Sequence, residues 1–249
     1  MAETHANRTI IRITGEDREE FLQGLVTSNV KGLAGLGYGA LLTPQGKYLA
    51  DFFLLPEGDA VLLDVDSSLA DMLLARLKMY RLRAKVAVEQ TDIYAIRGIG
   101  EMPEGAHPDP RHPALGWRIY QAEPGGAPEV DWDAIRVEHC IPATGSELGP
   151  DTFILEAGFD RMNGVDFRKG CYVGQEVTAR MRHKTELRKG FVSVDIDGEA
   201  IPGTPIVTED GKEAGLLATV AAGKAIAYLR FDRAKGPMTA GTARVTWAG

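Results

Sequence analysis

The spacing of apolar positions predicts a strand, a helix and a hairpin in the first sixty residues. RTIIRITG (8–15) alternates loosely, which is typical of a strand, and Asp17 opens a predicted helix. The apolar runs YGALL and YLADFFLL are joined by Thr43-Pro44-Gln45-Gly46-Lys47. A proline followed two positions later by glycine between apolar runs predicts a hairpin turn.

The next apolar runs continue the mixture of strands and helices. VLLDVD (61–66) predicts a strand, and SSLADMLLARLKMY (67–80) predicts a helix with Ser67 or Ser68 as its N-cap. RAKVAVEQ (83–90) and IYAIRGI (93–99) predict two further strands. Strands that alternate irregularly with helices and include an antiparallel hairpin favour an α+β fold over a regular βαβ array.

The pattern changes twice in the rest of the chain. Residues 101–130 are rich in Pro and Gly and predict a loop-dominated connection with one short strand, GWRIYQA. From Gly190 onward, short apolar runs broken by Gly, Pro and Asp-Gly predict a small antiparallel barrel or sandwich. We therefore expect two domains, residues 1–186 and 187–249.

Composition excludes several classes of partner. The formal net charge is −7, which argues against general binding to nucleic acids or anionic membranes, because both are polyanions. No apolar run approaches the roughly 20 residues that a membrane helix needs. The first residues do not resemble a signal peptide, and two cysteines fit a reducing compartment. We expect a cytoplasmic protein.

The metal-binding motifs CxxC and HExxH are absent, and the five histidines are scattered. A self-contained zinc or iron-sulfur site needs three or four ligands, so we expect no resident metal, while ligation by one residue together with a partner protein stays open. Cys171 in KGCYVGQE (169–176) has Arg168 and Lys169 before it and a predicted helix after it. Cations and helix N-termini favour the reactive thiolate, but a buried cysteine acting as a small apolar residue fits the residues equally well. Cys140 lacks this cationic setting, and we assign it no function.

Glu156 is a second candidate, because it lies among apolar residues in FILEAGFD (153–160). A carboxylate there needs partners, and it could accept two parallel hydrogen bonds from an amidine-like ring edge. An ordinary glutamate on a helix surface is the alternative. A local group of cations could attract a small polyanion, although each could equally be a solvated surface charge. These cations are Arg161, Arg168, Lys169, Arg180, Arg182, Lys184, Arg188 and Lys189.

The octet KGCYVGQE resembles the signature of the YgfZ family, folate-binding relatives of the glycine-cleavage T-protein (aminomethyltransferase). Other segments resemble this family in the same order along nearly the whole chain. They are Gly15-Glu16-Asp17 with Phe21 to Gly24, Thr27-Ser28-Asn29, Thr43 to Lys47, Tyr80 to Arg83, Ile141-Pro142, Leu155 to Gly158 and the C-terminal strands.

The resemblance implies a T-protein-like α+β folate-binding body of two interleaved subdomains, followed by a small antiparallel β-barrel. It implies tetrahydrofolate, or a one-carbon derivative of it, as cofactor, and iron-sulfur client or assembly proteins as partners. Cys171 corresponds to the essential motif cysteine, with Lys169 beside it as a catalytic residue. Glu156 corresponds to a glutamate that can read the pterin ring. The other residues implied in cofactor binding are Tyr172, Gln175, Glu176, Arg180 and Asn29.

The chain departs from the aminomethyltransferases at one catalytic position. Alignment of VDSSLADMLLARL places Leu73 where they carry an aspartate, with Asp71 two residues away. This departure favours a factor that assembles or repairs iron-sulfur clusters over a folate-dependent aminomethyltransferase or other one-carbon enzyme. A protein-interaction module that has lost the ligand is the third hypothesis.

Overall fold

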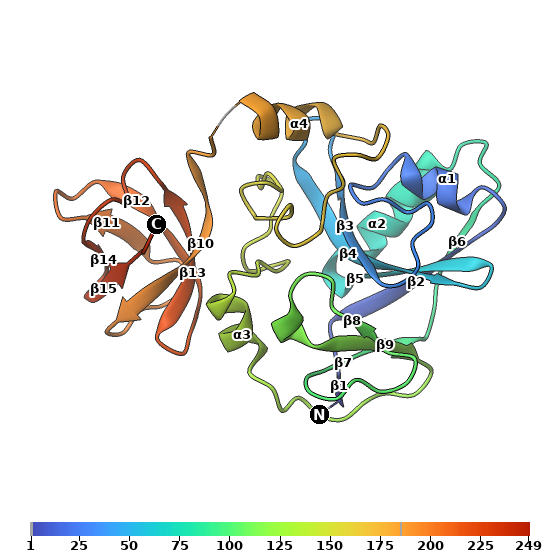
Figure 1. Ribbon diagram of the computed structural model, residues 1–249, viewed down its shortest axis with the longest axis horizontal. Helices are drawn as coiled ribbons and strands as arrows, with labels where there is room; N and C mark the ends of the chain where they lie inside the picture. Colours follow the sequence, from blue (N-terminus) through green and yellow to red (C-terminus); the bar gives the residue numbers. More distant parts are fainter. Residues whose placement is uncertain (1, 185) are drawn as a thin grey trace. The chain divides into compact units, whose positions relative to one another are not determined.

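Residues 2–184 and 186–249 are described by a computed structural model, which divides the chain into two compact units (Figure 1). The first unit comprises Met1–Val130 and Phe159–Val177, and the second comprises Asp131–Gly158 and Thr178–Gly249. Each unit is therefore built from two separate stretches of the chain.

The first unit is built on a five-stranded antiparallel sheet in the order β3-β4-β5-β2-β6. Its strands are β2 (Arg8–Thr14), β3 (Gly37–Leu42), β4 (Tyr48–Glu57), β5 (Ala60–Asp66) and β6 (Ala87–Gln90). The helices α1 (Arg18–Gln23) and α2 (Ser67–Tyr80) belong to the same unit. The predicted hairpin is confirmed, because β3 and β4 pair on either side of residues 43–47.

Side-chain alternation along the strands buries both faces of this sheet. Ile11 and Ile13 of β2 pack in a large apolar core with residues of α1 and α2, such as Leu22 and Leu73. Ile10 points the other way and packs in a smaller cluster on the opposite face. Successive side chains of a strand point to opposite faces, so a continuous apolar strand contributes side chains to the apolar clusters on both faces of the sheet.

The predicted helix 67–80 is confirmed, but its predicted cap is wrong. Asp66, one residue earlier, is the N-cap, and its carboxylate accepts a hydrogen bond from the backbone N–H of Ser68. Aspartate satisfies an unpaired N–H of the first turn and also suits the positive end of the helix dipole.

A second antiparallel sheet in the first unit has the order β1-β7-β9-β8. Its strands are β1 (Ala2–Thr4), β7 (Tyr94–Gly98), β8 (His107–Pro108) and β9 (Trp117–Gln121). The prediction of one strand between residues 101 and 130 is therefore incomplete. The missed strand, β8, has two residues, and the 3₁₀ turn η1 (Pro113–Leu115) separates it from β9.

The second unit contains α3 (Trp132–Glu138) and a closed antiparallel barrel in the order β10-β13-β12-β11-β14-β15, which confirms the predicted barrel. Its strands are β10 (Lys189–Asp197), β11 (Pro205–Thr208), β12 (Glu213–Ala221), β13 (Lys224–Arg230), β14 (Met238–Ala240) and β15 (Ala243–Thr246). Pairing of β15 with β10 closes the barrel around an apolar core.

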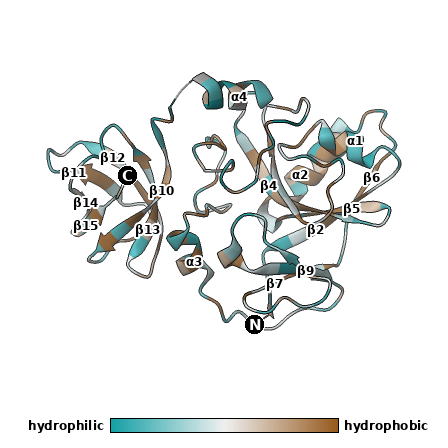
Figure 2. Ribbon diagram, viewed as in Figure 1, coloured by the Kyte–Doolittle hydropathy of each residue, from teal (hydrophilic) through white to brown (hydrophobic). Residues whose placement is uncertain are grey.

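Helix α4 (Gln175–Lys184) begins in the first unit and continues into the second. Most of it is coloured hydrophilic in Figure 2, whereas apolar colour is prominent on β4. Within the described residues, every helix is too short or too polar to qualify as a candidate membrane span. The α+β class is confirmed. The expected division into domains 1–186 and 187–249 stays a prediction.

Candidate functional site

The octet is irregular from Lys169 to Gly174, and its last two residues, Gln175 and Glu176, are the first two of α4. Cys171 is a free thiol and is exposed. The alternative of a buried apolar cysteine is therefore wrong for this residue. Exposure allows the sulfur to reach a ligand or another protein.

Lys169, expected beside the thiol as a catalytic group, is held by the backbone of the first unit. Its ammonium donates hydrogen bonds to the carbonyl oxygens of Gln23 at 2.8 Å and Ser28 at 2.9 Å, and also to that of Val26. Burial lowers the pKa of Lys169 to about 8, with Asp166 acting in the opposite direction. Most molecules therefore keep the charged form at neutral pH, and its three N–H donors match the three acceptors. This geometry ties the start of the octet to the backbone around the end of α1, and the catalytic role of Lys169 stays a prediction.

Two glycines let the octet approach the turn of the β3–β4 hairpin closely. Gly174 has a φ of +84°, and a Cβ there would lie 2.6 Å from the carbonyl oxygen of Thr43. Gly46 has a φ of +74°, and a Cβ there would lie 2.8 Å from the Cβ of Val177. Glycine alone tolerates both the backbone conformation and the contact. The structure thus brings together two motifs that lie more than 120 positions apart in the sequence.

The other expected residues of the first unit lie in the octet itself or, for Asn29, beside Gln23, whose carbonyl accepts from Lys169. Tyr172 is buried, and its ring centroid is 5.2 Å from the Nζ of Lys169. Asn29 accepts a hydrogen bond from the side chain of Gln23 at 2.8 Å. Gln175 is half-buried and Glu176 is exposed in the first turn of α4.

Glu156 lies in the second unit and is only 8% exposed, so it is not the surface glutamate of the alternative interpretation. The hydroxyl of Tyr228 donates to Oε2 of Glu156 at 2.5 Å, and the Nζ of Lys189 lies 4.0 Å from Oε1. Burial and the Glu156 carboxylate both raise the pKa of Tyr228, so its hydroxyl keeps the proton that it donates.

A cavity of about 370 Å³ opens beside Glu156 within the second unit. Its lining combines three cations with two carboxylates and two apolar side chains: Arg188, Lys189, Arg230, Glu156, Glu186, Met181 and Leu187. Tyr228 and Arg230 were missed by the sequence analysis, because they lie about 70 residues from Glu156 and only barrel closure brings them near. Arg180, expected in cofactor binding, is exposed on α4 and does not line this cavity.

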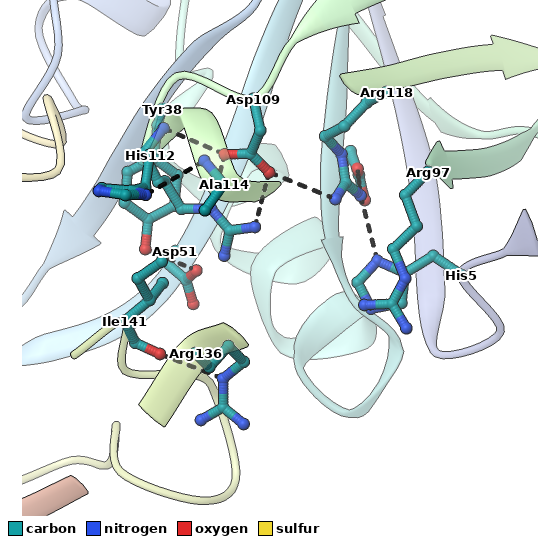
Figure 3. Close-up of polar contacts among 12 residues, drawn as sticks. His5, Tyr38, Asp51, Arg97, Asp109, His112, Ala114, Arg118, Arg136 and Ile141 are labelled. Atoms are coloured by element: carbon teal, nitrogen blue, oxygen red, sulfur yellow. Dashed lines mark hydrogen bonds and ion pairs between the residues drawn. The ribbon is translucent and has the colours of Figure 1, made fainter. Parts of the chain in front are cut away.

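A buried ion network in the first unit was also missed, and Figure 3 shows the part of it in which Arg118 lies near Asp109 and His5. Asp64 accepts hydrogen bonds from Arg8 at 2.6 Å, Arg118 at 2.7 Å and the Tyr120 hydroxyl at 2.9 Å. Burial alone would raise the pKa of Asp64, but the two guanidinium groups outweigh it and lower the pKa. The sequence does contain a signal for this network. Asp64 in VLLDVD and Arg118 in GWRIY are charged residues within apolar strands, and a charge that is buried in a strand needs a partner.

Comparisons with known proteins agree with this architecture. Residues 188–248 match the family described as "CAF17, C-terminal beta-barrel domain". The crystal structure of the glycine cleavage system aminomethyltransferase T from Bartonella henselae superposes with a TM-score of 0.79. It covers 98% of this chain and 83% of that chain at 14% identity. The likeness confirms the T-protein-like fold that the resemblance implied.

Two curated relatives carry the same printed description, "Iron-sulfur cluster assembly factor IBA57, mitochondrial". The mouse protein is 32% identical and the human protein 30% identical, and each alignment covers 93% of this chain and 78% of the relative. The chain therefore belongs to the family of the iron-sulfur cluster assembly factor IBA57, which confirms the YgfZ-type family predicted from the octet.

Proposed function

We propose that this protein binds tetrahydrofolate and assists the assembly or repair of iron-sulfur clusters in client enzymes, with the thiol of Cys171 essential. The role in cluster assembly is supported by membership of a family whose mouse and human members are described as iron-sulfur cluster assembly factors. The observation that carries the folate proposal is the buried carboxylate of Glu156 beside a cavity that three cations help to line.

The residues around Glu156 fit a pterin ring. Tyr228 occupies one acceptor position of Oε2, and Lys189 is too far from Oε1 for a hydrogen bond. A carboxylate offers about four acceptor positions, so the pair of N–H donors at a pterin edge can still be accepted. The cavity volume of about 370 Å³ lies within the range of small-molecule sites.

The cationic lining fits the other end of the ligand. The glutamate tail of tetrahydrofolate carries carboxylates, and Arg188, Lys189 and Arg230 line the same cavity as Glu156. These three cations outnumber the two lining carboxylates, Glu156 and Glu186, and they can pair with the carboxylates of the tail.

The remaining proposed roles belong to the octet and its surroundings. Cys171 supplies an exposed thiol, and Lys169 holds the segment that carries it. We retain Tyr172, Gln175, Glu176, Arg180 and Asn29 as proposed cofactor-binding residues. The cytoplasmic location also stays a prediction, since the relatives named above are described as mitochondrial.

Anaerobic calorimetric titration of tetrahydrofolate tests the folate site. We expect micromolar binding that Glu156→Gln weakens by more than about tenfold, or about 1.4 kcal/mol, because the neutral side chain loses the paired charge-assisted hydrogen bonds. Glu209→Gln, at an exposed position of the same unit, should bind like the wild type. Absence of binding to the wild type would remove the cofactor and favour the interaction-module hypothesis.

Recovery of an iron-sulfur enzyme in cells that lack their own copy of this protein tests the thiol. Cys171→Ala should bind tetrahydrofolate normally yet fail to restore the enzyme, whereas Cys140→Ala should restore it. Full recovery with Cys171→Ala would contradict the proposed role of the thiol.

A one-carbon enzyme is the second candidate, and α2 provides a reason to test it. Leu73 is fully buried in the core, so that position cannot present a side chain to a substrate, whereas Asp71 is exposed. The carboxylate of Asp71 is thus accessible to a substrate, although the alignment placed a leucine at the catalytic aspartate position. Transfer of a one-carbon unit from an aminomethyl donor to tetrahydrofolate, lost in Asp71→Asn, would establish this alternative.

A further inference from the structure

The turn that follows α2 presents a leucine to solvent. The side chain of Leu82 is 88% exposed, and that of Met79, in the last turn of the helix, is 59% exposed. Leu82 also adopts a φ of +42°, in the left-handed region. We call Met79–Arg83 the α2 knob.

Neither packing nor backbone geometry explains a leucine at this position. The left-handed residue after a helix is usually glycine, because a Cβ crowds the following carbonyl group. Leucine therefore strains the backbone here and also leaves an apolar side chain in water. A protein that buries this side chain on binding would recover the hydrophobic part of this cost.

The charges around Leu82 indicate what kind of surface would bury it. Residues 78–85 contain four cations and no acidic residue, although the chain as a whole has a net charge of −7. Lys78, Arg81 and Arg83 are exposed, and Lys85 pairs with Glu16. Cations near a helix C-terminus suit its dipole, but Arg83 lies beyond the helix end and gains little from it.

We propose that the α2 knob docks a client apoprotein, the iron-sulfur enzyme that is to receive a cluster, by inserting Leu82 into an apolar pocket with carboxylates at its rim. This inference rests on the proposed function, since cluster assembly requires contact with the protein that receives the cluster. Opposite charges at the rim would speed the encounter and set its orientation.

Two other occupants fit less well. A second copy of the chain, docked symmetrically, would bring the cations of two knobs together. An anionic membrane would meet one leucine and one methionine on a molecule of net charge −7, which offers little apolar area for insertion. A protein pocket suits a small apolar tip surrounded by cations.

The knob and the proposed working thiol belong to the same compact unit. Val173, two residues after Cys171, packs against the same core cluster as Tyr80 and Ala84, which flank the exposed turn. A client held by the knob is therefore held by the unit that carries Cys171.

Binding of purified apo-aconitase, a four-iron enzyme, tests the inference by fluorescence anisotropy. We expect Leu82→Gly to raise Kd more than about tenfold, while relief of backbone strain keeps the variant folded. Arg83→Glu should also weaken binding, and the difference from the wild type should shrink at high salt. Ile201→Gly removes a side chain that is 72% exposed in the other unit, and Lys235→Glu reverses an exposed charge there; both should bind like the wild type.

Aconitase recovery at graded expression levels in cells lacking the protein separates this inference from the proposed function. Leu82→Gly should require more protein for half-recovery but reach the same plateau. Identical curves and equal Kd values would overturn docking through the knob and leave the function standing. Leu82-dependent binding without recovery by the wild type would contradict the function and support docking. No binding of apo-aconitase to the wild type would overturn the docking proposal.

Discussion

The hydrogen bonds of Lys169 show that the contacts of a side chain can depend on backbone that lies far away in the sequence. Its neighbours in sequence suggested a cation for the thiol of Cys171. In the structure, its ammonium instead binds carbonyl groups at and beyond the end of α1, more than 140 positions away along the chain. Glu156 shows the same dependence, because its partner Tyr228 comes from the barrel.

Replacement of Lys169 by methionine should lower the free energy of unfolding by about 2 kcal/mol, because buried carbonyl oxygens lose their donor. Urea denaturation at pH 7 measures this loss. Lys31→Met is the matched control, since Lys31 forms an exposed ion pair with Glu20 and should cost less than about 1 kcal/mol. Equal stability of the Lys169→Met protein and the wild type would show that the carbonyl contacts do not hold the octet.

The hairpin was predictable from Pro44 and Gly46 between two apolar runs, and the octet was recognisable from its own eight residues. Their contact was not predictable, since it depends on how β3, β4 and the segment before α4 come together. The cap of α2 was also missed by one residue, because Asp66 is both the last residue of β5 and the N-cap of the helix.

Gly174→Ala should destabilise the protein by at least about 1 kcal/mol, because it combines a positive φ with a clash against the Thr43 carbonyl. Gly170→Ala is a control within the same octet, since a Cβ there would meet no atom within 4 Å. Thermal unfolding of both variants measures the difference. A Gly174→Ala protein as stable as Gly170→Ala would contradict the close approach between the two motifs.

Charges buried between the two sheets of the first unit link its stability to pH. His5 lies near Arg97 and Arg118, with ring-nitrogen distances of 3.3 Å and 3.2 Å (Figure 3). Burial and these arginines, together with Arg8 and Arg111, hold the pKa of His5 well below its usual value. His5 therefore stays neutral in the folded protein while the unfolded chain takes up a proton near pH 6.5.

Stability should consequently fall as pH drops below about 6.5, by about 1.4 kcal/mol per pH unit until His5 itself titrates. Urea denaturation at pH 7.5, 6.5 and 5.5 measures this slope. His5→Gln should flatten it, because the variant lacks the group that the unfolded state protonates. His183→Gln should keep the slope, since His183 is exposed. A slope unchanged by His5→Gln would assign the pH dependence to other groups.

Local spacing in the sequence was sufficient for most strands, the helix 67–80, the small antiparallel C-terminal domain and the family, because alternation, turn residues and the octet are short-range patterns, whereas the short strands β1 and β8 were missed. Only the folded chain could show which segments meet. The two compact units each combine separate stretches, and the contacts of Lys169, Glu156 and Asp64 all span more than 50 positions. Such contacts depend on chain closure and burial, which no local pattern encodes.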